Sequence, residues 1–125
     1  MSSNTYTISF NIETDGVNEE ELISCTNSAK DFGFIIYTDK ILWMHYQGGK
    51  LLYTYGSGAH EITLVKYSSI YNNTCILYID GSIQKIESTT VQNKLETSIT
   101  LTANNDSLKV NNIVAYSRSL SFAEV

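Results

Sequence analysis

The fold class of this chain is decided by one stretch of its sequence, Cys75-Ile76-Leu77-Tyr78-Ile79-Asp80-Gly81-Ser82. Apolar and β-favouring residues lead straight into Asp80-Gly81, and a second such run, Ile83-Gln84-Lys85-Ile86, follows at once. A two-residue type I′ turn needs positive φ at both central positions, which Asp tolerates and Gly adopts freely. The stretch therefore predicts a β-hairpin, and the turn fixes which residues face each other across it.

Strand signals continue on both sides of this hairpin, with almost no helix signal between them. In Tyr6–Ile12, the apolar residues Ile8, Phe10 and Ile12 alternate with polar ones and so share one face of a strand. The other segments with strand signals are Leu22–Cys25, Phe32–Tyr37, Ile41–Tyr46, Leu51–Tyr55, His60–Tyr67, Leu95–Thr102, Leu108–Val110 and Asn112–Ser117. Short strands that each end in a turn predict an all-β, antiparallel sandwich.

The composition limits what the chain can be. Its 125 residues suit one domain, and 42% hydrophobic residues are enough for a core without metals or cross-links. No apolar run approaches the length of a membrane span, so we expect a soluble globular domain without membrane insertion. The net charge of -5, with eight scattered Lys and Arg residues, excludes nucleic acid as a partner, because phosphate binding needs clustered positive charge.

The two cysteines, Cys25 and Cys75, lie far apart and have no CxxC companion, which argues against zinc and thioredoxin-like chemistry. We expect two free, buried thiols. A long-range disulfide is the alternative, and it depends on a Cα separation that the sequence does not contain.

The segment Ile41–Tyr46 carries bulky residues on both faces of its strand, and several tyrosines follow it. These aromatic side chains have two readings: they pack in the core, or some of them stay exposed as a platform on which a sugar ring stacks. The ligand-binding candidates under the second reading are Trp43, His45, Tyr46, Tyr53 and Tyr55. For His45 alone, a strand histidine with satisfied hydrogen bonds is the simpler reading.

Oxygen-bearing side chains in two loops provide weak candidates for a metal site, and calcium is the one cofactor they could bind. They are Asp15, Asn18, Asn105 and Asp106. None matches the EF-hand spacing, so a solvated loop is the alternative, above all for the acidic run Glu19–Glu21.

Catalytic signatures are missing from the sequence. Glycosidases need two carboxylates on either side of the scissile bond, and Glu13 and Asp15 stand only at the end of a strand beside a turn. No Ser, His and Asp set, phosphate-binding loop or zinc signature occurs. We therefore expect no enzymatic activity.

A capping box closes the sequence, with Ser121 as N-cap, Glu124 three residues on, and Leu120 and Val125 placed for a hydrophobic staple. It predicts the start of a helix where the sequence stops. Either the domain ends on a single turn or the chain was cut from a longer protein, and we expect the second.

Three segments in this order resemble the laminin-G-like members of the concanavalin A-like family: Tyr6-Thr7-Ile8-Ser9-Phe10, Leu77-Tyr78-Ile79-Asp80-Gly81 and the ending Asn112–Glu124. In that family a strand, a "LYVDG"-type hairpin and an "IYNRALS..E" tail recur. The resemblance covers nearly the whole chain, as one laminin-G-like domain over residues 1–125. It implies a jelly roll of two antiparallel sheets, one of them concave, with ligands on the concave face or at its rim. The chain departs from the family at Ala59-His60-Glu61, where a Trp-His-His-like segment is common.

The resemblance and the aromatic cluster together favour a non-catalytic, lectin-like module that binds cell-surface glycans or glycoconjugates. The alternative is a structural or protein-interaction domain, used as a spacer or assembly surface and able to form oligomers. Abundant Asn, Ile, Lys, Ser, Thr and Tyr without proline suggest an AT-rich genome. We therefore expect a bacterial surface protein or a phage tail or receptor-binding protein, located extracellularly, on the cell surface or on the virion surface.

Overall fold

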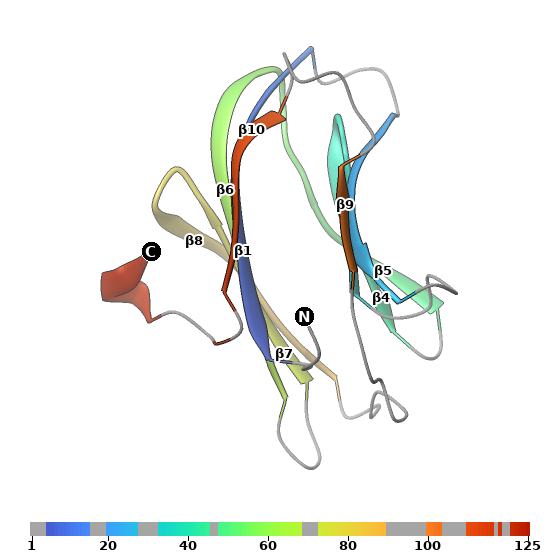
Figure 1. The fold of residues 1–125 in the computed structure, drawn as a ribbon, viewed down its shortest axis with the longest axis vertical. Coiled ribbons are helices and arrows are strands. Elements are labelled where there is room, and N and C mark those ends of the chain that lie inside the picture. Colours follow the sequence, from blue (N-terminus) through green and yellow to red (C-terminus); the bar gives the residue numbers. More distant parts are fainter. Residues whose placement is uncertain are drawn as a thin grey trace.

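The computed structural model describes residues 5–15, 20–27, 33–45, 48–68, 73–89, 100–103, 110–116, 118 and 121–125. Within these ranges the chain forms ten strands and one short 3-10 helix (Figure 1). The elements are β1 Tyr6–Thr14, β2 Glu21–Thr26, β3 Gly33–Tyr37, β4 Lys40–His45, β5 Gly48–Thr54, β6 Gly58–Ser68, β7 Asn73–Ile79, β8 Ser82–Thr89, β9 Thr100–Ala103, β10 Val110–Tyr116 and η1 Phe122–Glu124. No helix among the described residues is long and apolar enough to cross a membrane.

The strands form two five-stranded sheets, and every pair of neighbours is antiparallel. The first, called sheet A here, has the order β10-β1-β6-β7-β8, and the second, sheet B, has the order β5-β4-β3-β2-β9. The two sheets lie face to face in Figure 1. The predicted all-β antiparallel sandwich is confirmed.

The hairpin predicted at Asp80-Gly81 joins β7 and β8, with Ile79 paired to Ser82. Asp80 has φ 53° and Gly81 has φ 83°, which are the two positive values that a type I′ turn requires. The register shifts after this turn, since Tyr78 pairs with Ile83 but Leu77 pairs with Lys85. The extra residue in β8 is a β-bulge, a feature that bends an edge strand.

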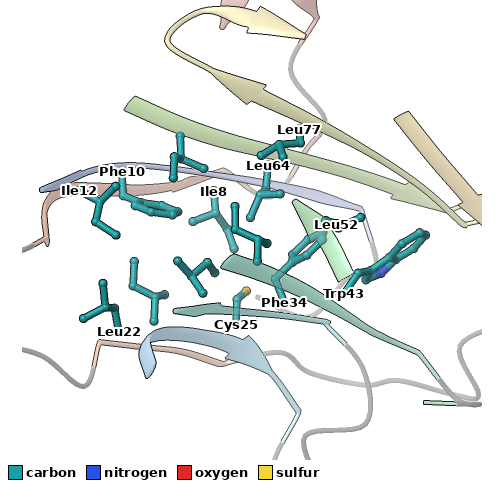
Figure 2. Close-up of a cluster of buried hydrophobic side chains, with 14 of the residues drawn as sticks. Ile8, Phe10, Ile12, Leu22, Cys25, Phe34, Trp43, Leu52, Leu64 and Leu77 are labelled. Carbon is teal, nitrogen blue, oxygen red and sulfur yellow. The ribbon is translucent and has the colours of Figure 1, made fainter. Parts of the chain in front are cut away.

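The core lies between the two sheets (Figure 2). Ile8, Phe10 and Ile12 all point into it, as their alternation predicted. Sheet A adds Leu64 and Leu77 from β6 and β7. The facing side chains of sheet B are Leu22, Cys25, Phe34, Trp43 and Leu52.

Both cysteines are free and buried, so the prediction of two unpaired thiols is confirmed. Burial raises the pKa of the Cys25 thiol to about 12, although a hydrogen bond with Tyr6 and the charge of Lys66 act in the opposite direction. Burial also raises the pKa of the Cys75 thiol far above its ordinary value, again against the charge of Lys66. The neutral thiol is therefore the stable form of both side chains.

The predicted start of the strand Leu51–Tyr55 is wrong, because Gly48, Gly49 and Lys50 already belong to β5 and pair with His45, Met44 and Trp43. Glycines extend the ladder here, although they weaken a strand signal in sequence.

One of the two hydrogen bonds of the predicted capping box is present at the C-terminal turn, and the Glu124 N–H bonds to the Ser121 carbonyl in place of the Ser121 hydroxyl. The Ser121 N–H donates to Oε1 of Glu124 at 3.0 Å, and the Glu124 N–H donates to the Ser121 carbonyl at 3.0 Å. Arg118 adds two hydrogen bonds to the same carboxylate, of 3.1 and 2.7 Å. The result is the single turn η1, while the predicted staple residue Leu120 lies outside the described residues.

Candidate binding surface on sheet A

Sheet A has one face against the core and one face that points away from sheet B, which we call the outer face. The tip of the β7–β8 hairpin and η1 both lie on the outer side of sheet A in Figure 1. Strand register assigns side chains to this face: Ser9 is paired with Thr63 and with Val114, and Asn11 is paired with Glu61 and with Asn111. Ser9 and Asn11 alternate along β1 with the buried Ile8, Phe10 and Ile12, so they and the residues paired with them point outward.

The outer face carries exposed apolar side chains among polar ones. Of the large apolar side chains that are exposed among the described residues, all except Leu51 lie on it. They are Tyr67, Ile83, Ile86, Val114 and Tyr116. Between them, Val65 and Tyr78 are almost fully buried. We call the five exposed side chains the apolar outer patch.

One end of sheet A is polar and hollowed. Asn111 of β10, Asn11 of β1 and Glu61 of β6 are paired in one row across three neighbouring strands. Asp80 of the hairpin turn extends this row, because its N–H donates to the Glu61 carbonyl at 2.8 Å. The row lies along a hollow of about 320 Å³. The hollow is lined by Asn11, Ile12, Glu13, Ala59, His60, Glu61, Asp80 and Asn111.

The carboxylate of Asp80 is held in place by the same contact between strands. The Glu61 N–H donates to Oδ1 of Asp80 at 2.9 Å, so the turn residue and β6 are joined by two reciprocal hydrogen bonds. The Asp80 side chain is still 60% exposed. One carboxylate oxygen thus fixes the side chain, and the other, Oδ2, lies 3.7 Å from Nδ1 of His60.

His60 lines the hollow, and a hydrogen bond and a ring contact fix the orientation of its imidazole. Its Nε2 lies 2.9 Å from the Gly56 carbonyl oxygen, and since a carbonyl can only accept, Nε2 carries the hydrogen. The Tyr55 ring packs edge-on against the imidazole, with centroids 5.6 Å apart. Nδ1 then lies 3.7 Å from Oδ2 of Asp80 and is buried, without a hydrogen-bond partner among the described residues.

The structure does not place the predicted aromatic candidates at this hollow. Trp43 is 2% exposed and stacks on Phe34 in the core, with ring centroids 6.4 Å apart. Tyr55 is 3% exposed, its hydroxyl donates to the Tyr37 carbonyl, and burial together with Asp39 raises its pKa. An exposed platform made of these two rings is therefore wrong, because their apolar faces are used for packing.

The remaining predicted ligand residues are only partly described. Tyr53 is half-buried and packs against the core from β5. His45 ends β4 in the structure, but its side chain lies outside the described residues, as does all of Tyr46. The exposed aromatic rings on the outer face are instead Tyr67 and Tyr116.

The predicted metal candidates are not brought together in the part of the chain that the structure describes. Asp15 is exposed just after β1, whereas Asn18, Asn105 and Asp106 lie outside the described residues. Among the residues that are described, no group of three or more His, Cys, Asp or Glu side chains could hold a metal ion.

Sequence reasoning missed the hollow because its polar row is assembled by register. The signals were present singly: Asn11 alternates with core residues, Asp80 occupies the turn, and Ala59-His60-Glu61 begins a strand. Nothing in the sequence says that Asn111 and Asn11 are opposite each other, since that depends on the pairing of the first and last strands of the chain.

Comparison with known proteins gives a likeness at the level of the fold. No protein-family model matches the chain, and no curated protein matches it. Solved structures that are similar include the binding domain of botulinum neurotoxin serotype C1, with 11% identity and a TM-score of 0.62 over 97% of this chain. Another, from work on the dependence of botulinum neurotoxin type C cell entry on two ganglioside molecules, has 10% identity and a TM-score of 0.61 over 97% of this chain.

A third is the binding domain of botulinum neurotoxin DC in complex with rat synaptotagmin II, with 11% identity and a TM-score of 0.63 over 96% of this chain. The chain spans only 34 to 35% of the length of these three structures. The likeness therefore extends to a β-sandwich that forms about a third of each, and it does not say which part of those proteins contacts ganglioside or synaptotagmin.

Proposed function

We propose that this chain is a non-catalytic, lectin-like module that binds cell-surface glycans, and that the hollow on sheet A is its sugar site. The single observation that carries this proposal is the row of Asn111, Asn11, Glu61 and Asp80 along the solvent-facing hollow. Carboxylates accept hydrogen bonds from sugar hydroxyls, and side-chain amides both donate and accept. A hollow of about 320 Å³ lies at the lower end of the range of small-molecule sites, roughly 300–1,000 Å³.

The likeness to solved structures adds limited support. Two of the structures are called binding domains, and the cell entry of one of those toxins depends on gangliosides, which are sialylated glycolipids. We take from them a binding role and not the sialylated ligand. We propose the corresponding setting here: residues 1–125 act as one laminin-G-like jelly-roll domain of a larger bacterial surface protein or phage receptor-binding protein, exposed outside the cell or on the virion.

A glycan array tests the proposal directly, followed by titration of the best ligand into isotopically labelled protein. Binding should shift the side-chain amide signals of Asn11 and Asn111 in NMR spectra. The Asn11→Ala variant should weaken binding by about tenfold, because a hydrogen-bonding partner of the sugar is lost. Thr74→Ala is the matched control, since Thr74 is on the same outer face but bonds to Ser88 away from the hollow.

An array without a single reproducible ligand would contradict the glycan-binding function. If binding shifts NMR signals other than those of Asn11 and Asn111 and is unaffected by Asn11→Ala, the chain is still a lectin, but its sugar site is not the hollow. Each hit should also be incubated with the protein and checked for hydrolysis, and release of a cleaved sugar would contradict the non-catalytic part of the proposal.

The apolar outer patch favours a second function, an assembly or protein-interaction surface. Ile83 and Ile86 are 44% and 59% exposed on β8, a strand at the edge of sheet A. We expect Ile86→Lys to dissociate any oligomer seen by sedimentation, because a charge would be buried at the contact. Leu51→Lys is the control, since Leu51 is 50% exposed on sheet B. A chain that stays monomeric at all concentrations and captures no partner would contradict this second function.

A further inference from the structure

The charged groups of the hollow are all of one sign. Its lining contains the carboxylates of Glu13, Glu61 and Asp80, and no Lys or Arg is among its described lining residues. Like charges within roughly 4–6 Å of one another oppose ionisation or approach. An anionic group entering the hollow would meet these carboxylates without a cation to balance it.

The hydrogen-bond donors of the hollow are few. The side-chain amides of Asn11 and Asn111 can donate, whereas ionised carboxylates can only accept. His60 uses its Nε2 hydrogen on the Gly56 carbonyl, and its buried Nδ1 lies 3.7 Å from Oδ2 of Asp80.

From this lining we infer that the hollow selects an uncharged, hydroxyl-rich sugar and rejects sialylated or otherwise anionic glycans, an inference that rests on the proposed lectin function. A sugar hydroxyl has a hydrogen to donate and lone pairs to accept, so it can satisfy a carboxylate and an asparagine amide together. The carboxylate of a sialic acid has no hydrogen to donate and carries the same charge as the lining. Selection follows from the excess of acceptors over donors.

Asp80 offers a substitution that changes this chemistry without disturbing the fold. Its φ of 53° is in the left-handed region, which Asn also tolerates, and Asn-Gly is a preferred type I′ turn. In Asp80→Asn, the amide oxygen can still accept from the Glu61 N–H. The new NH₂ group would replace Oδ2 and donate toward Nδ1 of His60, so the hollow loses one charge and one acceptor.

The test is an array on which each neutral oligosaccharide is printed beside its sialylated counterpart, probed in EDTA with the wild-type chain and three variants. The wild-type chain should bind neutral glycans and lose at least about tenfold in affinity on the sialylated counterparts. Asp80→Asn should weaken neutral binding by about tenfold and leave the melting temperature unchanged, because the turn is kept. Glu61→Gln removes another carboxylate of the same row and should also weaken neutral binding, so it tests the inference if Asp80→Asn alters the hairpin.

Glu87→Gln is the charge-matched control, because Glu87 pairs with Lys50 and Lys85 and is not part of the hollow. Its binding should equal that of the wild-type chain, and a loss like that of Asp80→Asn would show that only the net charge matters and overturn the inference. Preferential binding of the sialylated member of each pair would overturn the inference and leave the lectin function intact. Binding that EDTA abolishes would also overturn it, since the carboxylates would then serve a cation. No binding to either member would overturn the lectin function itself.

Discussion

Replacing Gly33 by alanine tests a close backbone contact between β2 and β3. Gly33 has φ 106°, and a Cβ on this residue would lie 2.0 Å from the carbonyl oxygen of Cys25 and 3.0 Å from the Cα of Thr26. Gly33 and Thr26 are paired in the β2–β3 ladder. The two strands would have to separate for the methyl group to fit, since both neighbouring atoms belong to the backbone.

The expected loss in the free energy of unfolding of Gly33→Ala has two parts. A non-glycine residue at a strongly positive φ costs about 1–3 kcal/mol. The methyl carbon must also gain about 1 Å to reach the 3.0 Å below which Cβ contacts are essentially never found. Losing one or two ladder hydrogen bonds to make this room costs about 0.5–1.5 kcal/mol each. Together these give a loss of about 1.5–6 kcal/mol, which is a large part of the roughly 5–15 kcal/mol that holds a typical domain folded.

Two other glycines separate these two parts. Gly58 has φ 110° but nothing within 4 Å of its Cβ position, so Gly58→Ala should show the backbone strain alone. Gly56 has no such φ and no close neighbour, so Gly56→Ala should be neutral or stabilise by about 0.4–1 kcal/mol. Urea unfolding, followed by the fluorescence of the buried Trp43, measures the free energy of unfolding of all three glycine variants. A Gly33→Ala variant no less stable than Gly58→Ala would refute the close approach of β2 and β3.

Three further predictions follow from burial and pKa. Trp43→Ala should lower the free energy of unfolding by about 3–5 kcal/mol in a denaturant titration, whereas lost glycan binding at unchanged stability would restore Trp43 as a contact residue. Cys25 and Cys75 should resist a thiol reagent at about pH 8 until guanidinium unfolds the chain, because burial raises both thiol pKa values, and rapid labelling of the folded protein would contradict this. The Glu124 carboxyl, whose pKa is lowered from 4.5 to about 2 chiefly by its hydrogen bonds to Arg118, should stabilise the C-terminal turn above about pH 4.5. That stabilisation should be lost as pH falls through about 2 in an NMR titration, and a Glu124 midpoint near 4.5 would disprove the pairing.

The sequence predicts those parts of the fold that depend on local patterns. Alternation placed Ile8, Phe10 and Ile12 in the core correctly, and the Asp-Gly pair located the hairpin. A period of two residues says which side chains share a face, but it does not say which face is inside when both are apolar. That is why Trp43 had two readings until the packing of β4 against the core was known.

The candidate site could not be predicted because it depends on pairing between distant segments. Asn11 and Asn111 are a hundred positions apart in sequence and meet only because β1 and β10 are neighbours in sheet A. Glu61 joins them through β6, on the other side of β1. Each of these residues is ordinary for the solvent face of a strand, and only their common row gives them a shared chemistry.

Asp80 links the fold to the proposed function, and its identity is informative for that reason. The type I′ turn would accept asparagine at this position as readily as aspartate, so the turn alone does not require a carboxylate. The hydrogen bond from the Glu61 N–H does not require one either, since an amide oxygen also accepts. What distinguishes aspartate is its second oxygen, Oδ2, which lies 3.7 Å from Nδ1 of His60, and both residues line the hollow. The proposed role in ligand binding would give this oxygen a function beyond the turn, and Asp80→Asn tests that role.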